Sequence, residues 1–111
     1  MDETQRRKAA NEAVFREVNE RIEALQRGFA LTEKEPLHLV CECDRLDCME
    51  RLSVTVDAYE LVRSRSDQFI VAEGHEDPAV ERIVDTGADY LVVRKRAGEP
   101  REIAEETDPR S

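Results

Sequence analysis

The chain has 111 residues, 39% of them charged and only 5% aromatic, and 26 acidic against 17 basic residues give a formal charge of −9. This balance argues against nucleic-acid binding, because affinity for a phosphate backbone rests on lysine and arginine. The length fits one domain with a sparse core, and small domains of this kind usually need a disulfide, a metal ion or a partner subunit for stability.

We expect no targeting or membrane-spanning segment. The first residues lack the apolar region of a signal peptide, and no apolar run approaches the length that crosses a bilayer. The chain is therefore predicted to be cytoplasmic and to make no membrane contact. Thiols stay reduced in the cytoplasm, so clustered cysteines there indicate metal or redox chemistry more often than a disulfide framework.

Residues 2 to about 28 are predicted to form one long helix, which Asp2 or Thr4 is placed to cap and Gly28 to end. Apolar residues recur there at spacings of three and four and form one stripe, Ala10, Val14, Val18, Ile22, Leu25 and Phe29. At 1.5 Å per residue such a helix is about 40 Å long, which exceeds the expected width of the remaining globule. The stripe therefore either packs on its own domain or binds a second copy or another protein.

All three cysteines lie within eight residues, as Cys41, Cys43 and Cys48. They follow an apolar run at 37–40 that is expected to be a strand. Side chains i and i+2 of a strand project from the same face, so the first two sulfurs point the same way. The polar residues 44–47 can then turn the chain and bring the third sulfur beside them. Three converging thiolates make a metal site that lacks one ligand.

Beyond the cysteines the chain is predicted to form a small, mainly antiparallel sheet. Alternating apolar residues indicate a returning strand over 49–56, and a short strand is expected over 69–72. Two further β-prone runs, at 80–85 and 90–95, are separated by Thr-Gly-Ala-Asp and predict a hairpin.

One short helix is expected over 57–63, with Thr55 as its cap. From Gly98 the sequence is acidic and weakly patterned, so we expect a few ordered residues near Ile103 and a frayed end. The predicted fold class is α+β, stabilised by zinc. The predicted divisions are the N-terminal helix at 1–29, a zinc-binding α+β domain at 37–104 and a tail at 105–111.

Two histidines are available to complete the metal site. His38 lies three residues before Cys41, which puts it on the opposite face of an extended strand. His75 lies in a Gly-His-Glu loop directly after a predicted strand, where Gly74 lets the backbone approach closely. We therefore predict a structural zinc ion with a Cys3His ligand set, and His38 remains the alternative imidazole. The predicted ligands are Cys41, Cys43, Cys48 and His75.

Acidic residues near the predicted site suggest two supporting roles. Glu76, Asp44 or Asp47 is placed to accept the second ring N–H of His75. If His75 is not a ligand, the zinc ion keeps a position for water, and Glu76 or Glu42 can act as the general base of a hydrolase. Against that reading, the sequence contains no glycine-rich phosphate loop, no HExxH motif and no recognisable nucleophile–histidine frame.

A second metal chemistry also stays open. Three cysteines and one histidine can hold a [2Fe–2S] cluster, which would make the chain an iron–sulfur protein or a thiol redox sensor. The opening Cys-x-Cys resembles the start of the CDGSH-type iron–sulfur motif, although no glycine follows a cysteine in this chain.

Most of the chain resembles a family of small uncharacterised actinobacterial proteins with a Cys-x-Cys-x4-Cys…His pattern. The matching segments are 11–20, 40–43 with Cys48, 56–63, 69–76 and the closing Glu105-Glu106-Thr107-Asp108-Pro109-Arg110. The resemblance implies a bacterial cytosolic protein with a shared Cys/His site and brings no established activity. Together with the motifs, it leads us to expect a non-enzymatic zinc-binding interaction or regulatory protein, which uses the helix stripe to bind itself or a protein partner.

Overall fold

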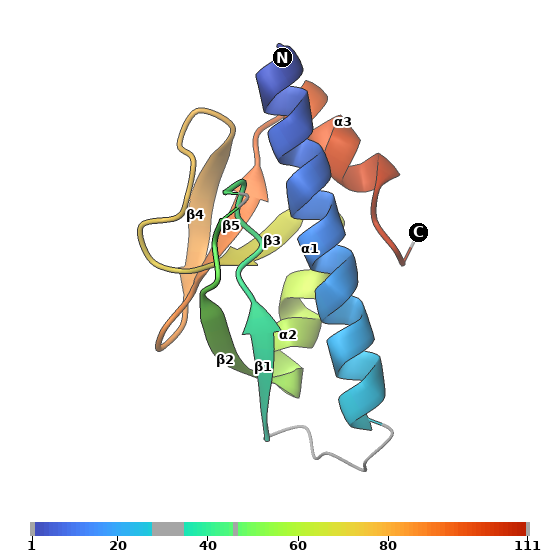
Figure 1. Cartoon of the computed structure of the whole chain (residues 1–111), viewed down its shortest axis with the longest axis vertical. Coiled ribbons are helices and arrows are strands. Elements are labelled where there is room, and N and C mark those ends of the chain that lie inside the picture. The colour runs from blue at the N-terminus through green and yellow to red at the C-terminus, as the bar shows by residue number, and fades with distance from the viewer. Residues whose placement is uncertain (1, 28–34, 46, 111) are drawn as a thin grey trace.

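A computed structural model describes residues 2–27, 35–45 and 47–110 of the chain. Over these residues the fold is α+β, with a long N-terminal helix lying along two small antiparallel sheets (Figure 1). The elements are α1 (Glu3–Arg27), β1 (Pro36–Val40), β2 (Arg51–Thr55), α2 (Val56–Arg63), β3 (Gln68–Val71), β4 (Glu81–Thr86), β5 (Leu91–Lys95) and α3 (Glu99–Glu106). None of the helices in the described ranges is long and apolar enough to cross a membrane.

The start of α1 is fixed by a reciprocal cap. The Asp2 carboxylate accepts a hydrogen bond from the Gln5 backbone N–H at 2.8 Å, and the Asp2 backbone N–H donates to Gln5 Oε1 at 3.2 Å. This arrangement satisfies backbone donors that a helix start otherwise leaves unpaired. Of the two predicted caps, Asp2 and Thr4, Asp2 is therefore the one that caps the helix. The predicted stop at Gly28 and the apolar Phe29 lie outside the described residues.

The first sheet pairs β1 with β2 in antiparallel register, from Pro36 opposite Thr55 to Val40 opposite Arg51. Both strands alternate between exposed and buried positions. The inward side chains are Leu37, Leu39, Leu52 and Val54, each at most 2% exposed. The predicted strand at 37–40 and the predicted returning strand are both confirmed, with bounds shifted by one or two residues.

The second sheet has the strand order β3-β5-β4, and each pair of neighbouring strands is antiparallel. The predicted hairpin is confirmed as β4 and β5, with an irregularity in the pairing between Ile83 and Asp85. Strands β3 and β5 carry most of the core on this side, including Phe69, Ile70, Val71 and Val93. Strand β4 is an edge strand, and beyond Glu81 its residues are exposed.

Helix α2 confirms the predicted short helix and its cap, because Thr55 Oγ1 accepts a hydrogen bond from the Ala58 backbone N–H at 3.2 Å. The helix packs between the two sheets and α1 and buries Tyr59 completely. The Tyr59 hydroxyl donates to Glu20 of α1 at 2.8 Å.

The face that α1 turns towards the sheets is polar, so of the two alternatives left open for the apolar stripe, the described part of α1 does not show packing on its own domain. The residues buried on α1 are Glu12, Arg16, Asn19 and Glu23. Of the predicted stripe, Val14, Val18 and Leu25 are 56%, 37% and 68% exposed, and among its described members only Ile22 packs against the core. Arg16 donates to the carbonyl oxygens of Ser66 and Ala104 at 2.6 Å each, and its guanidinium lies 4.3 Å from the centre of the Phe69 ring.

The C-terminal segment is more ordered than the sequence suggested. Helix α3 crosses the predicted boundary at residue 105 and buries Ala104. Asp108 forms an ion pair with the buried guanidinium of Arg63. Arg110 binds Glu20 and also Glu60 of α2, the latter at 2.6 Å. The expected frayed end is therefore wrong for residues 107–110, because acidic and basic groups from α1 and α2 hold this segment in place.

Candidate metal centre

The cysteine segment lies between the two sheets and is hydrogen-bonded to both. The Cys41 backbone N–H donates to the Glu50 carbonyl at 3.2 Å, beside β2, and the Glu42 backbone N–H donates to the Ile70 carbonyl of β3 at 2.8 Å. This extended conformation alternates side chains between two faces. Cys41 and Cys43 therefore project together on one side, as predicted, and Glu42 projects on the other.

Glu42 is fully buried and joins the cysteine segment to α1 and β3. Its carboxylate accepts from Asn19 Nδ2 at 2.7 Å and from the Ile70 backbone N–H at 3.0 Å. Asn19 also bonds both backbone groups of Val40, at 2.8 Å each. Burial raises the pKa of Glu42 to about 7, although both hydrogen bonds act in the opposite direction. The Glu42 side chain, between the two cysteines, thus holds the cysteine segment against α1.

His75 is aimed at the cysteines by a tight turn after β3. The His75 backbone N–H donates to the Ala72 carbonyl at 3.0 Å, and Gly74 inside the turn has φ +84°. Only glycine adopts that region of backbone conformation at no steric cost. The Arg45 guanidinium donates to the Gly74 carbonyl at 3.2 Å and so ties the cysteine turn to the histidine turn.

The structure brings Cys41, Cys43, Cys48 and His75 together. Their ligand atoms all lie within 4.8 Å of one another, and His75 Nδ1 is 3.6 Å from Cys41 Sγ and 3.5 Å from Cys48 Sγ. Cys41 and Cys43 are buried, whereas Cys48 and His75 are half-buried. Three sulfurs and one imidazole nitrogen around one point can hold a metal ion, with a path to solvent on the side of Cys48.

Hydrogen bonds already favour negative charge on the sulfurs. The Ala72 backbone N–H donates to Cys41 Sγ at 3.1 Å, and backbone N–H groups of Arg45 and Glu50 act in the same direction on Cys43 and Cys48. The Cys41 thiol hydrogen-bonds Cys43, which lowers the pKa of Cys43 to about 5 and raises that of Cys41. Burial raises the pKa of Cys48. One thiolate therefore forms readily, and full ionisation of all three sulfurs calls for a cation.

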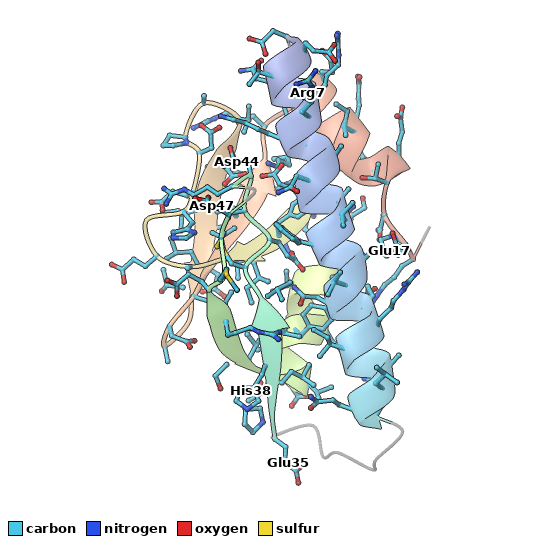
Figure 2. The ribbon with its side chains drawn as sticks, in the orientation of Figure 1. Arg7, Glu17, Glu35, His38, Asp44 and Asp47 are labelled. Atoms are coloured by element: carbon cyan, nitrogen blue, oxygen red, sulfur yellow. The ribbon has the colours of Figure 1, made fainter. Side chains whose placement is uncertain are left out.

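In the described part of the chain, the alternative imidazole and the acidic residues expected to support the site make no hydrogen bond to the His75 ring. His38 is an exposed residue of β1, away from the turn that carries Asp44 and Asp47 (Figure 2). Asp44 forms an ion pair with Lys8 of α1 at 3.7 Å. Within the described residues, no carboxylate hydrogen-bonds the His75 ring, so the expected support from Glu76, Asp44 or Asp47 is not found. Glu42 is turned away from the sulfurs, which rules it out as a general base at this site.

Sequence reasoning missed the residues that hold the site in place, chiefly Asn19, Glu42 and Arg45. A signal existed for Glu42, because a residue between two same-face cysteines of a strand must point to the opposite face. No comparable signal identified Asn19, which lies on a helix 21 positions before its partner Val40.

Comparison of this chain with protein families, with curated proteins and with solved structures finds no match in any of the three. The resemblance to actinobacterial proteins therefore stays a prediction.

Proposed function

We propose that the chain is a non-enzymatic zinc-binding protein whose Cys3His site is structural. The observation that carries this proposal is the spacing of the donors. Tetrahedral zinc binds histidine nitrogen at about 2.0 Å and cysteine sulfur at about 2.3 Å, which separates neighbouring nitrogen and sulfur ligands by about 3.5 Å. His75 Nδ1 lies 3.6 Å from Cys41 Sγ and 3.5 Å from Cys48 Sγ.

A structural role is supported by what the site connects. The cysteine turn follows β1 in one sheet, and His75 follows β3 in the other, so an ion shared by the two turns links both sheets. Four protein donors complete a tetrahedral shell and leave no position for a reacting water, unlike the three-ligand sites of zinc enzymes. These features favour a stabilising ion over a zinc hydrolase.

The same geometry favours one ion over an iron–sulfur cluster. A [2Fe–2S] cluster divides its four ligands into two pairs, one on each iron. Here His75 Nδ1 is almost equidistant from Cys41 and Cys48, and all four donors lie within 4.8 Å of one another. That arrangement is compact enough for a single metal ion.

Metal analysis of the purified chain tests this proposal. We expect one zinc per chain and no absorbance in the visible range, whereas a red-brown protein that contains iron would contradict zinc. His75→Ala should weaken zinc binding at least tenfold, because it removes one of four donors. His38→Ala is the matched control and should leave zinc affinity unchanged; equal losses in both variants would argue against the assignment of His75.

We further propose that the exposed stripe of α1 binds a second copy of this chain or another cytoplasmic protein. Val14, Val18 and Leu25 form an apolar row on a helix whose opposite face is already engaged with the sheets. Aligned apolar side chains on an exposed helix face are typical of helix-mediated association. The proposed biological role is therefore that of an interaction module, with no nucleic-acid or membrane partner.

Solution mass tests the self-association part of this proposal. If the stripe binds a second copy, the chain is dimeric, and Val18→Asp should shift it to the monomer because a carboxylate would be desolvated between the helices. Glu17→Gln changes the neighbouring charge without touching the stripe and should leave the mass unchanged. If the wild-type chain stays monomeric at high concentration, the homodimer is ruled out and only binding to a different protein remains.

A further inference from the structure

Three arginines converge on one buried carboxylate at the junction of β3, β5 and α3. Asp67 is 3% exposed and precedes β3. Its carboxylate lies 3.3 Å from Arg65 Nε, 2.9 Å from Arg94 Nε and 3.2 Å from Arg101 Nε. The arginines come from the α2–β3 turn, from β5 and from α3, so the fold rather than local sequence assembles them.

Each arginine meets Asp67 through Nε, which leaves the terminal nitrogens for other acceptors. In the described part of the chain, the terminal nitrogens of Arg65 and Arg94 have no hydrogen-bond or ion-pair partner. Arg101 uses one of its terminal nitrogens on the Lys95 carbonyl, at 3.3 Å. A guanidinium held at Nε keeps its outer N–H groups in fixed directions, and planar N–H pairs of this kind match the oxygens of phosphate and carboxylate.

The positive charge here exceeds what Asp67 neutralises. Arg82 of β4 lies directly opposite Arg94 in the β4–β5 register, and like charges in that relation destabilise a sheet. The same three arginines line a depression in the surface together with Asp67, Ser64, Ser66 and Glu105. The local balance is therefore positive within a chain of formal charge −9. An excess of positive charge at one place on an acidic protein favours an anionic ligand there.

We propose that Arg65, Arg94 and Arg101 form a binding site for a single phosphoryl group carried by a small molecule. Three guanidiniums can each donate to a different phosphate oxygen, while Asp67 holds them in place from behind. Glu105 on the rim and the acidic character of the whole chain disfavour extended polyanions, which need charge along their length. This site is independent of the cysteine cluster and does not rest on the proposed zinc role.

The test is an NMR titration of the full chain, as purified, that follows the arginine Nε–H signals. Inorganic phosphate and the amino acid phosphoserine should shift the signals of all three arginines saturably, whereas sodium chloride at matched ionic strength should not. Arg94→Gln should weaken phosphoserine binding roughly tenfold, as expected when one charge-assisted hydrogen bond is lost. Arg21→Gln, on the outer face of α1, is the matched control and should leave affinity unchanged.

Arg65→Gln provides a second test in case Arg94→Gln fails to fold. The Arg65 side chain is 50% exposed, so its loss should leave the melting temperature near wild type while phosphoserine affinity falls by a similar factor. Shifts that follow ionic strength alone, or an equal loss in Arg21→Gln, would overturn the proposal. A response to anionic lipid vesicles or to an RNA oligonucleotide, with none to phosphoserine, would overturn the assignment to a small molecule.

Discussion

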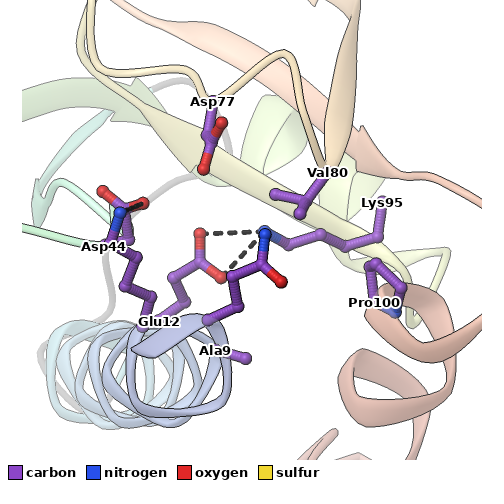
Figure 3. A pocket seen from close by; sticks show the side chains of 9 residues that line it. Ala9, Glu12, Asp44, Asp77, Val80, Lys95 and Pro100 are labelled. Atoms are coloured by element: carbon purple, nitrogen blue, oxygen red, sulfur yellow. Dashed lines mark hydrogen bonds and ion pairs between the residues drawn. The ribbon is translucent and has the colours of Figure 1, made fainter. Parts of the chain in front are cut away.

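Two buried clusters of ionisable side chains join distant parts of this chain, and they differ in where their positive charge comes from. The sulfur cluster, Cys41, Cys43, Cys48 and His75, brings three ionisable thiols together. The carboxylate cluster, Glu12, Glu81 and Lys95, contains its own cation. Lys95 Nζ lies 2.8 Å from both oxygens of Glu12 (Figure 3). It also lies 2.6 Å from Glu81 Oε1. The carboxylate cluster is complete when the chain folds, whereas the sulfur cluster, under the proposed zinc role, would take its cation from solution.

This difference shows two ways in which a small acidic domain can neutralise buried negative charge. Each cluster gathers groups that would repel one another if they were all ionised, and each needs a cation at its centre. An ammonium on a strand is always available, so the carboxylate cluster responds to pH and to mutation. If the sulfur cluster binds zinc as proposed, the ion must be acquired, and this cluster should also respond to the metal supply.

The largest effect is expected from Cys43→Ser. Loss of one thiolate should release the proposed zinc and unfold the sheets, since structural zinc can supply about 10 kcal/mol at neutral pH. Thermal melting by circular dichroism, together with metal content, measures this effect. A strong chelator should unfold the wild-type chain in the same way, and a variant that melts like wild type would show that the sulfur cluster does not hold the fold.

Lys95→Met comes next, because it removes the cation of the carboxylate cluster and leaves two buried carboxylates. Breaking a buried ion pair in this way costs about 3–5 kcal/mol, measured by denaturant unfolding with metal content held constant. The triple variant with Glu12→Gln and Glu81→Gln should recover much of that loss, since no buried charge remains. If the triple variant is no more stable than the single one, packing rather than charge explains the effect.

The pH dependence of the carboxylate cluster is a smaller effect. Burial raises the pKa of Glu12 to about 7, opposed by Lys95 and assisted by the charge of Glu81. The folded state therefore holds this proton more tightly than the unfolded chain, so the contribution is full below about pH 4.5 and is lost as the pH rises through 7. The wild type should lose about 2 kcal/mol relative to Glu12→Gln between pH 5 and pH 8.

Comparing those two proteins cancels the pH dependence of the cysteines, which both share. Denaturant unfolding at each pH gives the difference in the free energy of unfolding between wild type and Glu12→Gln. A difference that stays constant over this range would mean that Glu12 keeps an ordinary pKa, and that Lys95 compensates fully for its burial.

The smallest effect is expected at the surface, where charges are screened. Arg110 joins the C-terminal segment to Glu20 and Glu60, but its side chain is 33% exposed. Arg110→Gln should therefore cost only about 0.5–1 kcal/mol in low salt, and the difference from wild type should vanish in high salt. A loss as large as that of Lys95→Met would show that the C-terminal segment belongs to the buried charge network.

The sequence by itself determined the elements that depend on local patterns. Alternation over β1 and β2, the Thr55 cap of α2 and the turn between β4 and β5 are each encoded within a few residues. The spacing of the three cysteines and the position of Gly74 before His75 were enough to predict that these four side chains would meet. Each of these features rests on strand or turn geometry that neighbouring residues set by themselves.

Only the tertiary structure decided which face of α1 is buried and where the charges find partners. The sequence left open whether the apolar stripe faces inward or outward, and the structure buries Glu12, Arg16 and Asn19 instead, because their partners come from other elements. Lys95 lies 83 positions after Glu12, and Ala104 lies 88 positions after Arg16. Helical periodicity identifies the two faces of a helix, but a polar face can be buried once distant groups satisfy it, and those pairings exist only in the folded chain.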